Sequence, residues 1–337
     1  MGRYGWGGAV LALACLAGLM VGKASMDPAT VLAVLASRFP FVDLAPWWPA
    51  SSSAILWDVR LPRVVLGALA GAGLSVAGAT YQGLFRNPLA DPYLVGIAAG
   101  AGLGASLAMA APLPPGLYYL GVVQLSAFLV ALLTVALVYS LARVGGATPV
   151  TTLLLAGVAV GALASAATAF VMYSQGDKMV VIYAWMLGGF NVASWNQVWL
   201  VAPGVVGAAI AITVLGRVAN VMLLDEDQAR SLGVNVERVK LALVVGATLS
   251  TAAAVSAAGL IGFVGLMVPH VVRMLWGPDH RSLIPMSALL GAAFLVAADT
   301  SARLVPGPQE VPVGVVTALC GAPFFLWLLR QQKRSVF

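Results

Sequence analysis

Long apolar stretches recur along the chain, and short polar or proline-rich turns separate them. The apolar stretches are continuous rather than alternating, which favours helices in lipid over a membrane β-barrel. A helix that crosses a bilayer needs ~20 mostly apolar residues, so about ten spans fit. We predict spans at about 5–23, 61–84, 93–111, 117–142, 150–173, 195–217, 240–257, 259–276, 282–300 and 311–329. The pattern therefore predicts an all-α polytopic membrane protein, with residues 1–337 forming a single transmembrane domain.

Composition supports this fold class. The chain is 61% hydrophobic and only 9% charged, whereas soluble domains carry about 25% charged residues. Its 37 glycines suit close packing between helices in lipid. Cys15 and Cys320 both lie in apolar runs, so we interpret them as buried structural thiols, and no pattern of metal ligands is present.

The positions of the positive charges predict an orientation. If the N-terminus is cytoplasmic, about two-thirds of the 18 Lys and Arg residues fall on the cytoplasmic side. We therefore expect a multi-pass protein of the plasma (inner) membrane with both termini in the cytoplasm. The wetter segment before the second span should carry a short amphipathic helix near Ala29–Arg38 at the membrane surface.

The segment Asp225–Lys240 is the one dense group of charges in the chain. Asp225 is a plausible N-cap, acids follow in the first turn, and Gly233 suits a helix C-cap. Such a segment cannot lie in hydrocarbon, so it must meet water or another protein. The orientation above places it in the cytoplasm, between the sixth and seventh spans.

Catalytic chemistry finds little support in the sequence. The chain contains no GxxxxGK[ST] loop, paired histidines or nucleophile elbow, so we expect neither an enzyme nor a site for ATP on this chain. His280 lies in the polar turn GPDHR and is interpreted as a solvated residue. His270 is interpreted as structural, bonded to a carbonyl freed by Pro269, with a ligand or relay role as the alternative.

Several charges flank the predicted spans on the outer side. Arg60 and Arg63 favour a basic patch for an acidic partner, with snorkelling to the headgroups as the alternative. Asp299 and Arg303 have the spacing of a local helix salt bridge. Glu310 is interpreted as a cap of the last span, with a position along a transport path as the alternative.

Four long motifs resemble a known family. They are Arg60–Ala105, Ala229–Lys240, Gly259–Arg281 and Ala298–Leu329, in this order. Together they resemble the permeases of ABC importers for iron–siderophores, haem and cobalamin, and the similarity covers about residues 55–330. The run Tyr183–Phe190 resembles the cobalamin and siderophore members more than the haem members.

The resemblance implies a homodimeric type II ABC importer permease with ten helices in each subunit. Its partners would be a second copy, two ATPase subunits that bind ATP and Mg²⁺, a substrate-binding protein and the lipid membrane, with no nucleic acid and no cofactor on this chain. The coupling segment to the ATPase would be residues 224–238, with contacts from Asp227, Ala229, Arg230, Ser231, Leu232 and Gly233.

The resemblance also implies roles for other residues. The binding protein would dock on Arg60, Arg63 and Arg303. Candidate residues of the translocation path are Ser165, Thr168, Phe170 and Met172, for which ordinary helix packing is the alternative. The cytoplasmic gate would contain Asn87, Pro88, Leu89, Thr148, Pro149, Val150 and Thr151.

The expected function is therefore ATP-driven import of a metal chelate, namely a ferric siderophore, cobalamin or haem. An ion-coupled secondary transporter is the alternative, but it would need a buried charge at mid-membrane, and every acidic residue falls in a loop or near the end of a span. A structural membrane scaffold is the third hypothesis.

Overall fold

A computed structural model describes residues 2–22, 26–42, 44–114, 116, 121–224, 226–307 and 309–334. Across these residues the chain is helical, apart from loops and one isolated bridge between Val144 and Ala147. Asp225, the expected N-cap, lies outside the described residues.

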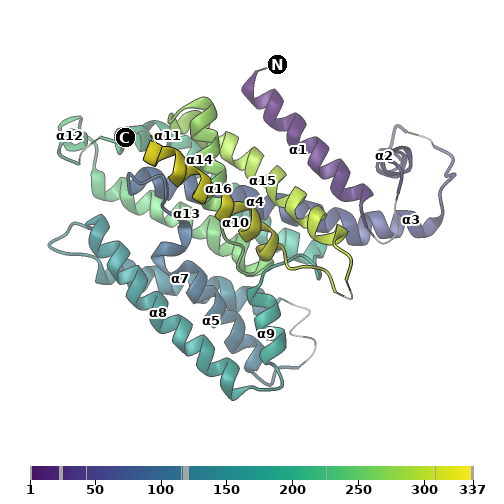
Figure 1. Ribbon diagram of the computed structural model, residues 1–337, viewed down its shortest axis with the longest axis horizontal. Coiled ribbons are helices and arrows are strands. Elements are labelled where there is room, and N and C mark those ends of the chain that lie inside the picture. Colours follow the sequence, from purple (N-terminus) through teal and green to yellow (C-terminus); the bar gives the residue numbers. More distant parts are fainter. Residues whose placement is uncertain are drawn as a thin grey trace.

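The helices follow one another in the order shown in Figure 1. They are α1 (Arg3–Met20), α2 (Pro28–Ala36), α3 (Ala50–Ala54), α4 (Leu61–Leu84), α5 (Ile97–Ala110), α7 (Val122–Leu141), α8 (Val150–Ser174), α9 (Met179–Met186), α10 (Trp195–Val214), α11 (Gly216–Val221), α12 (Glu226–Ser231), α13 (Val236–Ala258), α14 (Val264–Trp276), α15 (His280–Leu304) and α16 (Val313–Arg334). A π-helical turn η1 (Ile55–Arg60) leads into α4, and a 3₁₀ turn η2 (Pro92–Val95) precedes α5.

Helix α4 is the centre of the fold, because α10, α13, α14 and α15 all pack around it. Small residues make this close approach feasible. A Cβ added at Gly78 would strike the Gly265 carbonyl of α14, and one added at Gly71 would strike the Gly291 carbonyl of α15. Ser250 Oγ on α13 donates to the Gly73 carbonyl at 3.0 Å. Because these glycines have no side chain, the backbone of α4 can touch the backbones of α14 and α15 directly.

Helices α5, α7 and α8 form a second group, which Figure 1 shows below the α4 group. Ser126 Oγ on α7 donates to the Gly104 carbonyl on α5 at 2.7 Å. Helix α13 joins the two groups because it packs against α5 and α7 as well as against α4. Helix α8 lies at the edge, and only 17% of its most apolar stretch is buried.

The long helices agree with most predicted spans, but two predicted spans are short in the structure. Among the described residues, seven helices are long and apolar enough to cross a membrane, and three apolar stretches are shorter: Ile97–Ala110, Val264–Trp276 and Val313–Leu328. The last of these belongs to α16, which continues to Arg334. At 1.5 Å per residue, a helix of about 14 residues such as α5 or α14 spans only about 21 Å. The chain just before α5 and α14 runs as turns, which a hydropathy pattern does not separate from helix.

Three further details differ from the sequence-based expectation. The helix expected from residue 61 begins at Ala50 and runs unbroken to Leu84, because the turn Ile55–Arg60 continues it as π-helix. Cys320 is exposed on α16 rather than buried, while Cys15 is half-buried. A helix is present where an amphipathic one was expected near Ala29–Arg38, but α2 (PATVLAVLA) has Thr30 as its one polar side chain and is not amphipathic. It is capped by the Asp27 side chain at 3.0 Å from the Thr30 amide.

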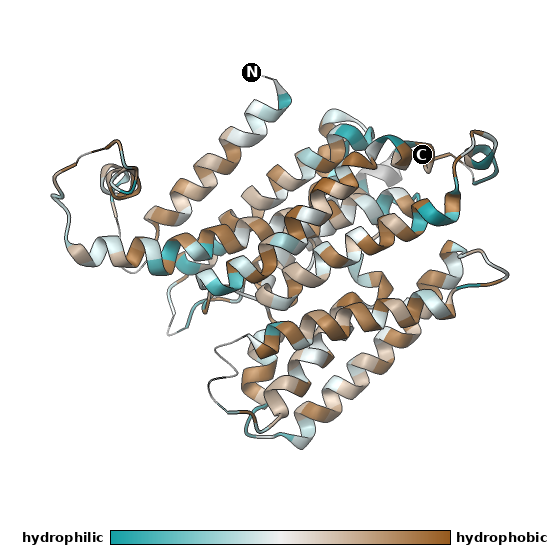
Figure 2. Cartoon of the chain, turned by 180° about the vertical axis from the view of Figure 1, so that it is seen from behind, coloured by the Kyte–Doolittle hydropathy of each residue, from teal (hydrophilic) through white to brown (hydrophobic). Residues whose placement is uncertain are grey.

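Hydropathy varies along each long helix from its middle to its ends. Figure 2 shows hydrophobic residues over their middles and hydrophilic residues gathered at their ends and in the connecting segments. The largest hydrophilic groups lie around α12 and at the far end, where α3 leads into α4. These ends hold the charged clusters described next.

Candidate transport path and coupling segment

A groove of about 420 Å³ runs between α8 on one side and η2 and α5 on the other. Gly157 on α8 lets η2 approach, because a Cβ there would strike the Leu94 carbonyl. Gly96 has a φ of +84° and turns the chain from η2 into α5. The groove is lined by Tyr93, Leu94, Gly96, Ala98, Ala99, Gly102, Gly157, Val158, Gly161, Ser165, Thr168, Ala169, Met172, Met186 and Leu260.

Three of the four residues expected along a path line this groove. Ser165, Thr168 and Met172 share one face of α8, since residues three and four positions apart lie above one another on a helix. Phe170 is outside the groove lining, and 70% of its surface is exposed. The Thr168 hydroxyl donates to the Ala164 carbonyl at 2.9 Å, so its hydrogen bond is satisfied within the helix. Most of the other residues that line the groove are glycines or apolar residues, so its wall is made mainly of small and apolar groups.

The turn after α4 carries the first group of expected gate residues. The Asn87 side-chain oxygen accepts from the Leu89 amide at 2.9 Å, which closes the turn locally. Gln82 holds the turn against α14, because its Nε2 donates to the Leu266 carbonyl at 3.0 Å while Arg273 Nη1 donates to its Oε1 at 2.9 Å.

A second cavity of about 420 Å³ lies beside this turn. It is lined by Asn87, Pro88, Leu89, Phe263, Leu266, His270, Phe325 and Leu328. His270 packs edge-on against Phe324 and Phe325, with ring centroids 6.1 Å away in both cases. The carbonyl near its ring is that of Pro88 rather than one freed by Pro269, and His270 Nδ1 is buried without a hydrogen-bond partner among the described residues.

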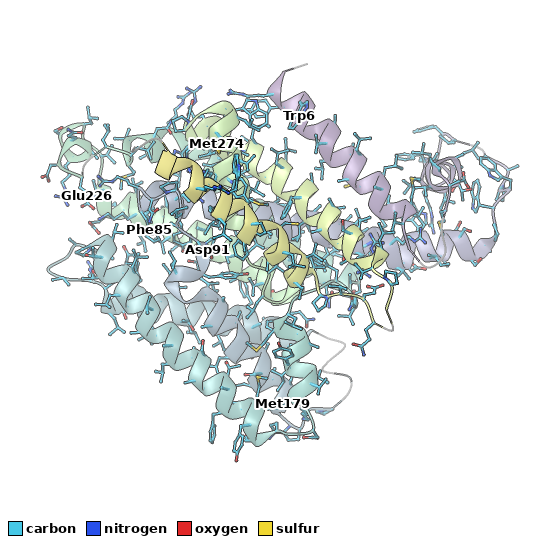
Figure 3. The ribbon with its side chains drawn as sticks, viewed as in Figure 1. Trp6, Phe85, Asp91, Met179, Glu226 and Met274 are labelled. Carbon is cyan, nitrogen blue, oxygen red and sulfur yellow. The ribbon has the colours of Figure 1, made fainter. Side chains whose placement is uncertain are left out.

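A third cavity of about 390 Å³ borders the second group of expected gate residues. Its lining brings together the end of α4, the loop before α8, and the α12–α13 pair: Leu84, Phe85, Arg86, Ala147, Pro149, Val150, Thr151, Glu226 and Lys240. Figure 3 shows Phe85 and Glu226 at the same end of the molecule. Thr148 is buried beside it, and its amide donates to Glu237 Oε2 at 3.0 Å.

The expected coupling segment contains the short helix α12. Gly233, with a φ of +81°, ends it as predicted: its amide bonds to the Arg230 carbonyl, and the Val234 amide bonds to the Ala229 carbonyl. The expected contact residues on the surface of this chain are Asp227, Arg230, Ser231, Leu232 and Gly233.

Ala229 corrects one expectation for this segment. Its exposed fraction is 0%, because it lies on the face of α12 that turns into the protein. A partner seated on α12 would therefore touch the opposite face, where Leu232 is 64% exposed. Ala229 serves the packing of the segment rather than direct contact.

Lys240 forms an ion-pair cluster that sequence reasoning did not identify. Its ammonium lies 2.7 Å from Glu226 Oε1 and 3.2 Å from Glu237 Oε1, and it donates to the Thr148 carbonyl at 3.2 Å. The i,i+3 spacing of Glu237 and Lys240 was visible in the sequence. The contact with Glu226 depends on how α12 folds back on α13, so the sequence pattern does not contain it.

A second buried cluster lies at the opposite end of α4. Arg63 Nη2 lies 2.8 Å from both Asp299 Oδ1 and Glu310 Oε2, and 3.4 Å from Asn191 Oδ1. The predicted pair of Asp299 and Arg303 is confirmed at 3.3 Å. Glu310 was expected to cap the last span, but its carboxylate pairs with Arg63 instead.

Arg60 and Arg303 bind the carbonyl end of α1. Arg60 Nη1 donates to the carbonyls of Leu19 and Met20, at 2.6 and 3.0 Å. Arg303 donates to the carbonyls of Val21 and Gly18, at 2.7 and 3.0 Å. The last carbonyls of a helix lack partners within it, so these guanidinium groups act as a C-terminal cap. The expected basic patch is thus turned inward in this chain.

His280 was expected in solvent, and that expectation is wrong. It is the first residue of α15 and is 2% exposed. Its Nδ1 lies 2.9 Å from Asn220 Oδ1, which also accepts from the His280 amide at 2.8 Å. A Cβ added at Gly83 would strike its Nε2. The polar turn packs against α4 and α11, which a local sequence pattern cannot reveal.

Within the described residues, no group of three or more His, Cys, Asp or Glu side chains is arranged to hold a metal ion. The most prominent features of the described residues are the groove along α8, the two cavities and the two charged clusters.

Comparisons with known proteins agree with this geometry. The profile of the FecCD transport family matches residues 10–331. The cobalamin import system permease protein BtuC of Halobacterium salinarum is 48% identical over 285 residues, covering 85% of this chain and 76% of that protein. The hemin transport system permease protein HmuU of Yersinia pestis is 40% identical over 295 residues, covering 86% of this chain and 88% of that protein.

A solved structure extends the similarity to three dimensions. An inward-facing metal-chelate type ABC transporter matches with a TM-score of 0.83 and 29% identity, over 98% of each chain. Together, the family profile and the relatives give one result: the chain belongs to the FecCD transport family.

Proposed function

We propose that this FecCD-family chain is the permease subunit of an ABC importer that moves a metal chelate into the cytoplasm. The chain is a transport subunit, as its relatives are, and not itself an enzyme. The observation that carries the proposal is the groove along α8, where Ser165, Thr168 and Met172 line about 420 Å³. The named relatives import cobalamin and hemin, so the substrate class is a large metal chelate.

The proposed assembly contains two copies of this chain, two ATPase subunits carrying ATP and Mg²⁺, and a substrate-binding protein. The exposure of α8 supports the second copy. Only 17% of its most apolar stretch is buried, and Leu155, Leu163 and Phe170 are each at least 70% exposed. A second copy would cover part of this surface and close the groove into a path, and Phe170 would then belong to its wall.

We also propose ten membrane crossings with both termini in the cytoplasm. The seven long apolar helices and the three shorter ones add to ten (7 + 3). An even number of crossings leaves both ends on one side, and the excess of Lys and Arg favours the cytoplasm for that side. This orientation places α12 where a soluble ATPase can reach it.

The proposed gate consists of the turn Asn87–Leu89 and the segment Thr148–Thr151. Each group borders a cavity, and the end of α4 lies beside the second segment. Movement of α12 would reach the gate through its neighbours. Asp227, Arg230, Ser231, Leu232 and Gly233 are the proposed surface for the ATPase.

Docking of the binding protein on Arg60, Arg63 and Arg303 remains a prediction. Arg63 and Arg303 pair with Asp299, and Arg63 also pairs with Glu310, so an acidic partner would act on the positive charge that these two carboxylates leave over. The test is the affinity of the binding protein for folded complexes that carry Arg60→Gln or Arg303→Gln, and unchanged affinity would contradict docking.

The decisive test of the function is uptake by proteoliposomes that contain the complete complex, with labelled cobalamin, haem and ferric siderophores offered separately. ATP-dependent uptake of one chelate is expected. Uptake driven by an ion gradient without ATP would instead support a secondary transporter, and absence of uptake with every chelate would contradict the proposal.

A further inference from the structure

The ammonium of Lys240 is a buried charge at the point where three segments meet. Its side chain is 5% exposed, whereas those of Glu226 and Glu237 are 31% and 28% exposed. A buried charge is costly unless it is paired and hydrogen-bonded. Lys240 has two carboxylate partners and one carbonyl partner, so its position is determined by all three.

Each partner belongs to a different segment of the chain. Glu226 is the first residue of α12, and Glu237 lies with Lys240 in the first turns of α13. Thr148 belongs to the loop before α8. Glu237 Oε2 also accepts from the Thr148 amide, so the amide and the carbonyl of this one loop residue are both held by the cluster.

The cluster continues to the outer face of α12. Arg230 Nη2 lies 3.4 Å from Glu226 Oε2, and the Arg230 side chain is 51% exposed. A chain of charged contacts thus runs from the solvent face of α12, through Glu226 and Lys240, to the backbone of Thr148. Its two ends are the proposed ATPase surface and the proposed gate.

Apolar packing holds α12 to the core through Ala229, its buried residue. Towards the segment 147–151 the structure instead has a cavity of about 390 Å³, which Glu226 and Lys240 line together with the end of α4. Electrostatic contacts are stronger away from bulk water. The charged cluster is therefore a direct link from α12 to Thr148 in this segment.

We propose that Lys240 is a positioning residue that makes α12 and the segment Ala147–Thr151, which leads into α8, move as one body, so that displacement of α12 by the ATPase displaces the gate. This inference rests on the proposed function, because it specifies how motion of the ATPase would be transmitted from α12 to the gate of the importer. A contiguous network with a fixed geometry is a physical means of such coupling.

The first test measures the distance between α12 and the loop. Spin labels are placed at exposed positions by Gln228→Cys and Val144→Cys, in a chain with Cys15→Ser and Cys320→Ser, within the complete complex. The distance within one chain is measured without nucleotide and with ATP. A narrow distribution that is the same in both states is expected, whereas Lys240→Met should broaden it and make it depend on ATP.

The second test measures chelate uptake per ATP hydrolysed. A purely structural defect would lower uptake and hydrolysis together, whereas loss of the link should lower the ratio by about threefold or more, as coupling residues typically do. Arg217→Gln removes an exposed positive charge on α11, outside the cluster, and is the matched control.

Glu226→Gln provides a milder variant, because it removes the contact to α12 while Lys240 keeps Glu237 and Thr148. Normal label distances and a normal uptake ratio in both Lys240→Met and Glu226→Gln would overturn the inference. If Lys240→Met does not assemble, Glu226→Gln alone decides.

Failure of the proposed function is distinguishable from failure of this inference, because the wild-type complex would then take up no chelate while the label distances could still be measured.

Discussion

Arg63 and Asp299 are 236 positions apart in the sequence, yet Arg63 Nη2 lies 2.8 Å from Asp299 Oδ1. Arg63 Nε lies 3.0 Å from the other carboxylate oxygen, so the contact is bidentate. The pair joins α4 to α15, the helix packed most extensively against it. Since both side chains are buried, neither charge can be rehydrated when the other is removed.

Asp299→Asn should therefore destabilise the protein by about 3 kcal/mol, since it leaves the Arg63 charge buried without its main counter-ion. Thermal unfolding of the purified protein in detergent measures the effect. Glu310→Gln is the matched control, and its smaller effect is expected because Glu310 is 30% exposed. Equal losses in the two variants would contradict the ranking.

Gly78→Ala should disrupt the contact between α4 and α14, because the new methyl group would strike the backbone carbonyl of Gly265. A rigid backbone atom cannot move aside as a side chain can, so we expect a loss of about 1–3 kcal/mol or failure to fold. Gly207→Ala on α10 is the control, since nothing lies within 4 Å of its added Cβ. Its unfolding temperature should be unchanged or higher.

Ser165→Trp should reduce uptake by filling the groove along α8. Ser165 lines the groove and is exposed, so a larger side chain fits without breaking a packed core. Uptake of the transported chelate by proteoliposomes is the measurement. Leu133, on α7, is 66% exposed and lies outside the groove lining. Leu133→Trp therefore places the same indole outside the groove, and equal inhibition by both variants would argue against a path there.

Leu232→Asp should weaken association with the ATPase by about tenfold or more, as loss of a central apolar contact typically does. Since Leu232 is 64% exposed, the unfolding temperature should not change. Association is measured by co-purification and by titration of the ATPase subunit. Unchanged association would remove α12 from the proposed interface.

Asp91 should make stability depend on pH. Burial raises the pKa of its carboxyl to about 6 from the usual 3.8, and its Oδ1 accepts from the Tyr93 amide at 2.7 Å. Figure 3 shows it on the connection that leads from α4 towards α5. Because the folded pKa is the higher one, the ionised form is penalised in the fold. Stability should therefore fall as pH rises from about 4 to 6, and stay level above.

Asp91→Asn keeps the acceptor for the Tyr93 amide and removes the titrating proton. It should be more stable than the wild type above pH 6, by about 3 kcal/mol at most, and similar to it near pH 4. Unfolding temperatures of both proteins between pH 4 and 8 measure the difference. Parallel curves would contradict the role of Asp91.

The sequence predicted the local features that depend on a single segment. Hydropathy located the long helices, the glycine at 233 located the end of α12, and the spacing of Asp299 and Arg303 predicted their pair. The family resemblance assigned Ser165, Thr168, Phe170 and Met172 to one helix, and the spacing of Ser165, Thr168 and Met172 puts these three on the face that lines the groove. Each of these follows from the period of one helix or the conformation of one residue.

The sequence alone did not predict features formed between segments. His280 was expected in a solvated loop because its neighbours are polar, but it is buried by α4 and α11. Arg60, Arg63 and Arg303 were expected to form an open patch, but α1 carbonyls bind Arg60 and Arg303, while Asp299 and Glu310 pair with Arg63.

The sequence by itself determined the class of the protein: a helical membrane chain with few charges and one polar segment in water, because hydropathy and charge are properties of the residues themselves. Only the tertiary structure decided which charges meet. Lys240 reaches Glu226 and Thr148, and Arg63 reaches Asp299, because folding brings distant helix ends within a few ångströms, and buried charges must find their partners there.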